Sequence, residues 1–118
     1  MVADPKSIAR AYLEALERKD YQAMRGLVHD DLSFRGPMTA VSNANDFIKA
    51  VSMLESITER VEIRKMIAEG GEVCALYDFV TTVPIGTARM AECYTIEEGK
   101  IRTIELYFDP RPWMASPG

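Results

Sequence analysis

The sequence is poor in the residues that build metal sites. Its 118 residues include one histidine, His29, and two cysteines, Cys74 and Cys93, which are far apart in the chain. Because zinc is held by clustered cysteine and histidine ligands, this set excludes a zinc centre, and we expect neither a metal nor a cofactor. A disulfide between the two cysteines stays open, although nothing in the sequence requires one.

The chain also lacks an excess of positive charge. Its 14 basic and 18 acidic residues give a formal net charge of −4. Since nucleic acids and anionic membranes attract basic surfaces, neither is expected as a partner. No apolar run is long enough to span a bilayer, and the segment Met1–Lys6 contains no apolar signal region. We therefore expect a cytoplasmic protein with reduced thiols.

What the chain has in abundance is apolar residues, at 47%, enough for the core of a single domain over residues 1–118. The first third predicts three helices. Asp4 and Pro5 are typical of a helix start, Asp20 predicts the cap of a second helix, and Asn43 or Asn45 that of a third. Apolar residues recur at helical spacing along the first helix, namely Ile8, Ala11, Tyr12, Ala15 and Leu16.

The rest of the chain predicts strands. Residues 32–34 form a short strand among the helices, and four longer strands follow at about 61–68, 73–82, 88–96 and 101–108, separated by turns rich in Gly and Pro. Consecutive strands of this kind form an antiparallel meander. The predicted fold is α+β, with three N-terminal helices on a curved, mostly antiparallel sheet that forms a cone around an internal pocket.

The last hairpin predicts which strand face lines the pocket. The turn at residues 97–99 places Glu92 near Leu106, and the more apolar set of alternating residues is assigned to the inner face. That inner set is Met90, Glu92, Tyr94, Ile96, Ile104, Leu106 and Phe108, and the outer set is Ala91, Cys93, Thr95, Thr103, Glu105 and Tyr107.

Glu92 is the exception on this inner face. A carboxylate among apolar neighbours costs several kcal/mol unless it is paired or protonated, and its desolvation raises its pKa. This is typical of an acid in a functional pocket. The alternative is a register shift of one residue, which would turn Glu92 to solvent.

Asp78 interrupts the strand at 73–82, where Asp is disfavoured. If it also faces inward, it shares the pocket with Glu92, and the pair supplies one proton donor and one acceptor. The alternative is an outward Asp78 that meets Arg89 or Lys65.

Aromatic side chains complete the candidate site. Tyr12 lies on the inner face of the first helix, where it either packs in the core or donates a hydrogen bond to a ligand. Trp113 lies either over the pocket or at an interface. The residues expected to bind substrate are Phe34, Met90, Tyr94, Leu106, Phe108 and Trp113.

Several segments resemble the nuclear transport factor 2-like superfamily. Ala11–Leu16 and Asp30-Asp31 are similar to the opening of its domains, while Val83–Gly86, Glu98–Ile101 and Tyr107–Asp109 resemble regions of limonene epoxide hydrolase and of SnoaL-like polyketide cyclases. The resemblance covers nearly the whole chain and implies a homodimer through the outer sheet face. These are scaffold motifs, specific for the fold and weak for activity.

The resemblance to ketosteroid isomerase implies that Tyr12 and Glu92 hold an oxyanion, but Gly36 stands where that enzyme has its basic Asp. The resemblance to SnoaL-like cyclases implies a catalytic role for Asp109, which is also a common scaffold residue that caps the turn before Pro110.

The resemblance to limonene epoxide hydrolase is incomplete. Asp78 matches one acidic residue of its water-activating set, whereas Leu76, Leu106, Phe34 and Gly36 replace the other members. That hydration machinery is therefore mostly missing.

Three functions are compatible with these features. The first is a cofactor-independent isomerase or cyclase in which Glu92, with Asp78, Tyr12 and Asp109 as further candidate catalytic residues, moves a proton on a hydrophobic substrate. The second is a module that binds an apolar ligand without catalysis. The third is an interaction domain that pairs with a twin through its outer sheet face.

Overall fold

The computed structural model describes residues 4–114. Its helices are α1 (Pro5–Arg18), α2 (Tyr21–Gly26), α3 (Ala44–Ser52) and the short α4 (Arg111–Met114), and its strands are β1 (Val28–Arg35), β2 (Ala40–Val41), β3 (Thr58–Glu69), β4 (Glu72–Thr81), β5 (Thr87–Glu97) and β6 (Lys100–Tyr107). The three N-terminal helices are confirmed, and α4 is an element that the sequence did not predict.

The helices begin where capping residues predict. The side chain of Asp4 accepts the backbone N–H of Ser7, that of Asp20 accepts the N–H of Ala23, and that of Asn43 accepts the N–H of Asp46. Each bond satisfies an amide that has no partner inside its helix. Of the two candidate caps of α3, the structure therefore selects Asn43.

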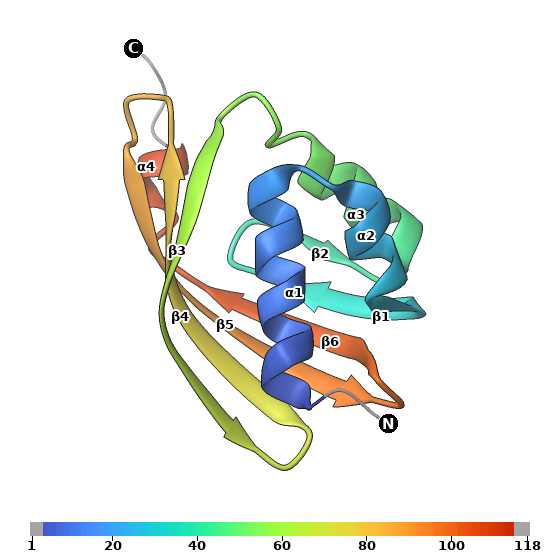
Figure 1. Cartoon of the computed structure of the whole chain (residues 1–118). Helices are drawn as coiled ribbons and strands as arrows, with labels where there is room; N and C mark the ends of the chain where they lie inside the picture. Colours follow the sequence, from blue (N-terminus) through green and yellow to red (C-terminus); the bar gives the residue numbers. More distant parts are fainter. Residues whose placement is uncertain (1–3, 115–118) are drawn as a thin grey trace.

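The six strands form one curved sheet in the order β2-β1-β6-β5-β4-β3. Strands β3 to β6 form the predicted antiparallel meander, and β1 joins β6 in parallel. Figure 1 shows α1 lying across the concave side of the sheet, with α2 and α3 beside β1 and β2. The α+β class and the mostly antiparallel curved sheet are thus confirmed.

The predicted inner and outer faces of the last hairpin are also confirmed. Glu92 lies opposite Leu106 and Tyr94 opposite Ile104 on the inner face, whereas Cys93 lies opposite Glu105 on the outer face. The turn between the strands has Gly99 at φ 78°, a left-handed conformation that suits glycine. The inner face and the helices together bury the core, which includes Tyr12, Tyr94 and Ile104.

Cys74 and Cys93 form a disulfide between β4 and β5 on the outer face. The two residues lie directly opposite each other, with their Cα atoms 4.1 Å apart, so the expectation of reduced thiols is not met. The sequence separation of 19 residues had hidden this proximity, which follows only once the strand register is known.

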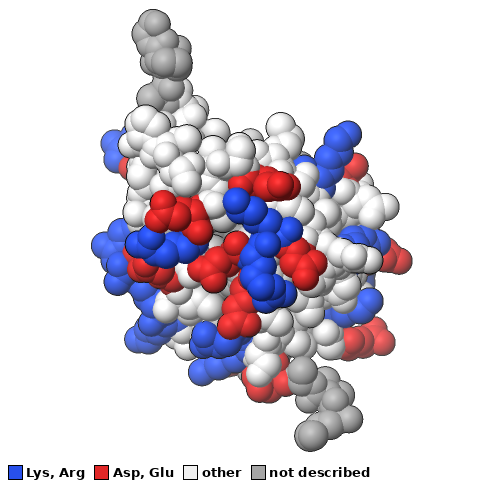
Figure 2. Space-filling model, turned by 45° about the horizontal axis from the view of Figure 1, so that its top comes forward, with Lys and Arg blue, Asp and Glu red and all other residues white. Residues whose placement is uncertain are grey.

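Charged side chains of both signs lie next to one another on the surface that Figure 2 shows. Ion pairs link Arg25 with Asp30 and Arg102 with Asp31. None of the helices between residues 4 and 114 combines the length and the apolar character needed to cross a membrane.

Candidate functional site

A cavity of about 260 Å³ lies between the inner face of the sheet and the helices. Its wall is almost wholly apolar and comes from α1, α3, α4, β1, β4, β5, β6 and the loop after β1. Its lining residues are Tyr12, Leu16, Phe34, Gly36, Pro37, Met38, Thr39, Phe47, Ala50, Val51, Leu54, Tyr77, Phe79, Met90, Glu92, Leu106, Phe108 and Trp113.

Glu92 is the one carboxyl in this lining, and it is 3% exposed. The hydroxyl of Tyr94 donates a hydrogen bond to its Oε1 atom at 2.6 Å, and the hydroxyl of Tyr77 donates to the same atom at 3.2 Å. No described residue bonds Oε2, and this atom is not among the side-chain atoms that are both fully buried and unpaired. Oε2 is therefore the atom that Glu92 offers to the cavity.

Burial raises the pKa of Glu92 to about 7, although the hydrogen bonds from Tyr94 and Tyr77 act in the opposite direction. Desolvation dominates because the described residues of the cavity wall offer hydroxyl groups but no cation to stabilise the charged form. Near neutral pH the carboxyl is therefore present in both protonation states, the condition under which one group both gives and takes protons efficiently.

The hydroxyl of Tyr12 lies close to this carboxyl. The ring of Tyr12 packs edge to face against that of Tyr94, with the ring centroids 5.5 Å apart. Burial, and to a smaller extent the negative charge of Glu92, raises the pKa of Tyr12 well above its ordinary value. Among the described residues, the hydroxyl of Tyr12 has no hydrogen-bond partner, although it lines the cavity. It is thus placed to bond a ligand.

Asp78 does not share this site. Tyr77 and Phe79 line the cavity, so Asp78 between them points to the outer face, where Arg64 donates a hydrogen bond to its Oδ2 atom. This hydrogen bond lowers the pKa of Asp78. The prediction that two carboxylates share the pocket is therefore wrong, and the alternative outward orientation holds. Arg64 is the hydrogen-bond partner, and Arg89, directly opposite Asp78 on β5 as the alternative expected, adds a smaller electrostatic attraction.

Asp109 is also outside the cavity. Its carboxylate accepts the backbone N–H of Arg111 at 3.0 Å and pairs with the guanidinium of the same residue. These bonds lower its pKa to about 2. Asp109 therefore has the local capping role that the sequence left as its alternative.

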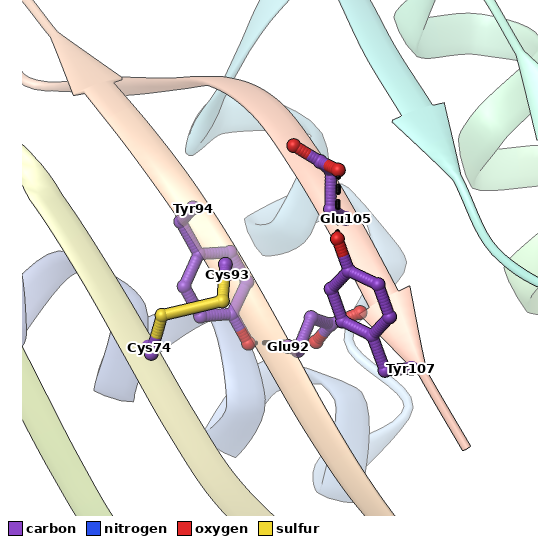
Figure 3. Close-up of a disulfide and its surroundings, with 6 residues drawn as sticks. All are labelled: Cys74, Glu92, Cys93, Tyr94, Glu105 and Tyr107. Atoms are coloured by element: carbon purple, nitrogen blue, oxygen red, sulfur yellow. Dashed lines mark hydrogen bonds between the residues drawn. A yellow bond between two sulfur atoms is a disulfide. The ribbon is translucent and has the colours of Figure 1, made fainter.

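The other predicted residues lie at the cavity. Phe34, Met90, Leu106, Phe108 and Trp113 line it, and Tyr94 reaches it through its bond to Glu92. Figure 3 shows Tyr94 turned toward Glu92 on one side of β5 and the disulfide of Cys93 on the other. Trp113 packs against Phe79 and Phe108, with ring centroids 6.2 and 6.1 Å away, so it lies over the pocket as one of the two alternatives expected.

Sequence reasoning missed Tyr77, which donates to Glu92. The signal was its position in β4, because Val73, Ala75, Tyr77 and Phe79 alternate onto one buried face. Apolar residues on the other face of this strand, such as Leu76 and Val80, obscured the alternation.

A family model for the SnoaL-like domain matches residues 9–104. The chain is a SnoaL-like domain. No curated protein matches its sequence. The cavity, with Glu92 and Tyr12 in its wall, is thus the candidate site of a SnoaL-like domain.

Solved structures share the fold of this SnoaL-like domain at low identity. An NTF2-like protein of unknown function from Cytophaga hutchinsonii is 22% identical, with a TM-score of 0.83 over 98% of this chain and 97% of that chain. An LEH-like epoxide hydrolase from M. tuberculosis is 16% identical, with a TM-score of 0.77 over 90% and 83%. A de novo designed protein with a curved β-sheet is 18% identical, with a TM-score of 0.81 over 91% and 86%. Because a designed protein shares the fold too, function must be argued from the cavity itself.

Proposed function

We propose that this SnoaL-like domain binds a hydrophobic small molecule in its cavity and transfers a proton between Glu92 and that molecule, without a cofactor. The supporting observation is the position of the carboxyl, buried in the wall of an apolar cavity with one oxygen that no described residue hydrogen-bonds. A group whose pKa lies near 7 serves as acid and base in one cycle, as an isomerisation or a cyclisation requires.

Three tyrosines support this role in two different ways. The bonds that Tyr77 and Tyr94 donate to Oε1 fix the carboxyl in one orientation, so that Oε2 meets the substrate. The free hydroxyl of Tyr12 would hydrogen-bond the polar group of the same molecule.

A proton-exchange assay tests the proposal. Hydrophobic ketones, lactones and epoxides, including ones that carry an amino group, are incubated with the protein in deuterated water, and deuterium uptake and turnover are followed by mass spectrometry. Since general acid–base catalysis contributes roughly 10²- to 10⁴-fold, Glu92→Gln should reduce the rate by about 100-fold or more. Glu105→Gln is the matched control, because Glu105 is an exposed carboxylate on the outer face. Equal rates for the two variants would refute catalysis by Glu92.

Binding without catalysis is the second candidate. It is favoured by the outward orientation of Asp78, which leaves Glu92 without a second acid in the lining. In this case ligands bind the cavity, but no exchange above the rate of the Glu92→Gln variant is seen.

We also propose a homodimer through the outer sheet face. Three large apolar side chains, Ile67, Leu76 and Tyr107, are exposed on this face close to the disulfide. Sedimentation should give a dimer for the wild type and a monomer for Leu76→Glu, whereas a monomeric wild type would refute the proposal.

A further inference from the structure

The cavity wall is rich in aromatic side chains. All four phenylalanines and the single tryptophan of the chain line it, together with Tyr12 and Tyr77. The faces of aromatic rings carry a partial negative charge that attracts cations. A ligand in this cavity therefore meets aromatic surface from the helices and from the sheet.

Glu92, when ionised, adds a full negative charge to this wall, and no cation among residues 4–114 pairs with it. Among the described residues that line the cavity there is no Lys, Arg or His, and only tyrosine hydroxyls contact the carboxyl. This differs from the other nearly buried acid, Asp78, which pairs with Arg64. A buried carboxylate without a counterion costs several kcal/mol, so a ligand that supplies the missing positive charge recovers much of that energy.

The hydroxyl oxygens around Glu92 suit the same kind of ligand. Tyr77 and Tyr94 use their protons in the bonds to Oε1, so their oxygens are left as acceptors. The oxygen of Tyr12 is a further acceptor in the wall. Oε2 together with these oxygens forms a group of acceptors around Glu92, in the wall of an aromatic cavity.

We propose that the molecule held in this cavity is a hydrophobic amine, bound as an ammonium ion that donates its N–H to Oε2 of Glu92 and packs its substituents on the aromatic wall. This ligand class rests on the proposed function, because the ammonium group and the transferred proton would meet the same carboxyl.

The proton balance of binding is defined. An ammonium ion that enters while Glu92 is protonated displaces the carboxyl proton to solvent, and a neutral amine takes that proton itself, so both routes end in one carboxylate–ammonium pair. Burial keeps Glu92 protonated below a pKa of about 7, so the affinity for the cation should rise with pH up to that value and then level off.

The groups that face Glu92 do not alter this pH dependence. They are the hydroxyls of Tyr12 from α1, Tyr77 from β4 and Tyr94 from β5, and burial keeps the pKa of each well above its ordinary value. The residues of α3 and β6 that line the cavity are apolar.

Two probes of the same shape test the ligand class. N,N-dimethylbenzylamine is protonated at neutral pH, and isobutylbenzene is its neutral counterpart with carbon in place of nitrogen. Binding of both is measured by NMR titration between pH 5.5 and 8.5 for the wild type, Glu92→Gln and the control Glu105→Gln. Since hydrogen bonds between charged groups contribute about 1.5–3 kcal/mol, Glu92→Gln should weaken binding of the amine roughly tenfold to hundredfold at pH 8.

Isobutylbenzene and the control variant separate the loss of the Glu92 charge from a general disturbance of the cavity. The neutral probe should bind Glu92→Gln at least as tightly as the wild type, and Glu105→Gln should bind both probes as the wild type does. Amine binding that is equal in all three proteins, or weakened equally by both substitutions, would overturn the inference, because the cation would then not be held by Glu92. If isobutylbenzene binds while the amine does not, the ligand class is wrong and the proposed apolar site remains. If neither probe binds the wild type, both are wrong.

Discussion

Glu92 and Asp78 are acids in the middle of neighbouring strands, and both are almost completely buried, with exposures of 3% and 5%. Their environments nevertheless shift the two pKa values in opposite directions. Asp78 on the outer face accepts a hydrogen bond from Arg64, which lowers its pKa. Glu92 on the inner face has only tyrosine hydroxyls as partners, and burial raises its pKa to about 7.

This difference shows that burial alone does not set the charge state of a carboxyl group. The outer face has a cation within reach of its acid and keeps it charged, whereas the inner face leaves its acid unbalanced at the cavity wall. An arrangement that costs stability without a packing benefit is typical of a functional site. The acid of the outer face thus has a structural role, and the acid of the inner face is the candidate for chemistry.

The largest expected effect comes from removing the unbalanced charge. Because the pKa of Glu92 rises from 4.5 to about 7 on folding, the folded protein loses stability as pH rises between these values, by about 3 kcal/mol in total. Glu92→Gln should therefore be more stable than the wild type at pH 8, by up to that amount, and equally stable near pH 4.5. Urea unfolding of both proteins across this range measures the difference.

Two outcomes of the same experiment would contradict this prediction. If Glu92→Gln is less stable than the wild type at pH 8, or if the difference between them does not change with pH, the carboxyl is not destabilised by burial.

Removal of the disulfide on the outer face should lower the stability of the protein, the opposite of the effect expected for Glu92→Gln. The disulfide between Cys74 and Cys93 closes a loop with a sequence separation of 19, for which the chain-entropy model gives a stabilisation of about 3 kcal/mol. The double variant Cys74→Ser/Cys93→Ser should lose up to this amount in urea unfolding. Its Glu92 titration should match that of the wild type, and a shift in that titration would show that the two faces are not independent.

A large part of this comparison was predictable from sequence. The hairpin turn at residues 97–99 and the apolar alternation beyond it favoured an inward Glu92 opposite Leu106, and the structure selects this register over the shift of one residue. The capping residues Asp4 and Asp20 predicted where two helices begin, since capping depends only on local backbone geometry.

The outward orientation of Asp78 was not predictable to the same degree. Apolar residues occupy both faces of β4, so the alternation did not decide which face is buried. Its partner Arg64 lies at an irregularity between Ile63 and Lys65 in β3, and such bulges are set by the tertiary fold. The role of Tyr77 was missed and the pairing of the cysteines was left open, because both depend on the register between β4 and β5.

A smaller effect is expected from the outer acid. Asp78→Asn removes an ion pair whose Arg64 side chain is 55% exposed, so solvent screening limits the loss of stability at pH 7 to less than about 1 kcal/mol. Because the pKa of Asp78 is lowered, this loss should disappear as the pH falls through the folded-state pKa, below the ordinary value of 3.8. Urea unfolding at pH 7 and at a pH below the folded-state pKa measures this loss of stability. A variant as stable as the wild type at pH 7 would show that the ion pair contributes nothing.

The smallest effect distinguishes the two hydroxyl donors of Glu92. Tyr94→Phe removes the bond of 2.6 Å and Tyr77→Phe the bond of 3.2 Å, so both should raise the pKa of Glu92, the first by up to about one unit and the second by less. Carboxyl-carbon NMR of each variant measures the shift. A lowered pKa in either variant would mean that the hydroxyl does not stabilise the carboxylate.

The most direct test of the account is the pH titration of the Glu92 and Asp78 carboxyl carbons by NMR in the wild-type protein. The account predicts that Glu92 titrates near pH 7 and Asp78 below its ordinary value, and that a bound hydrophobic ligand shifts the Glu92 titration alone. A Glu92 carboxyl that titrates near 4.5 and ignores such ligands would contradict the account, because the cavity would then hold no acid suited to proton transfer.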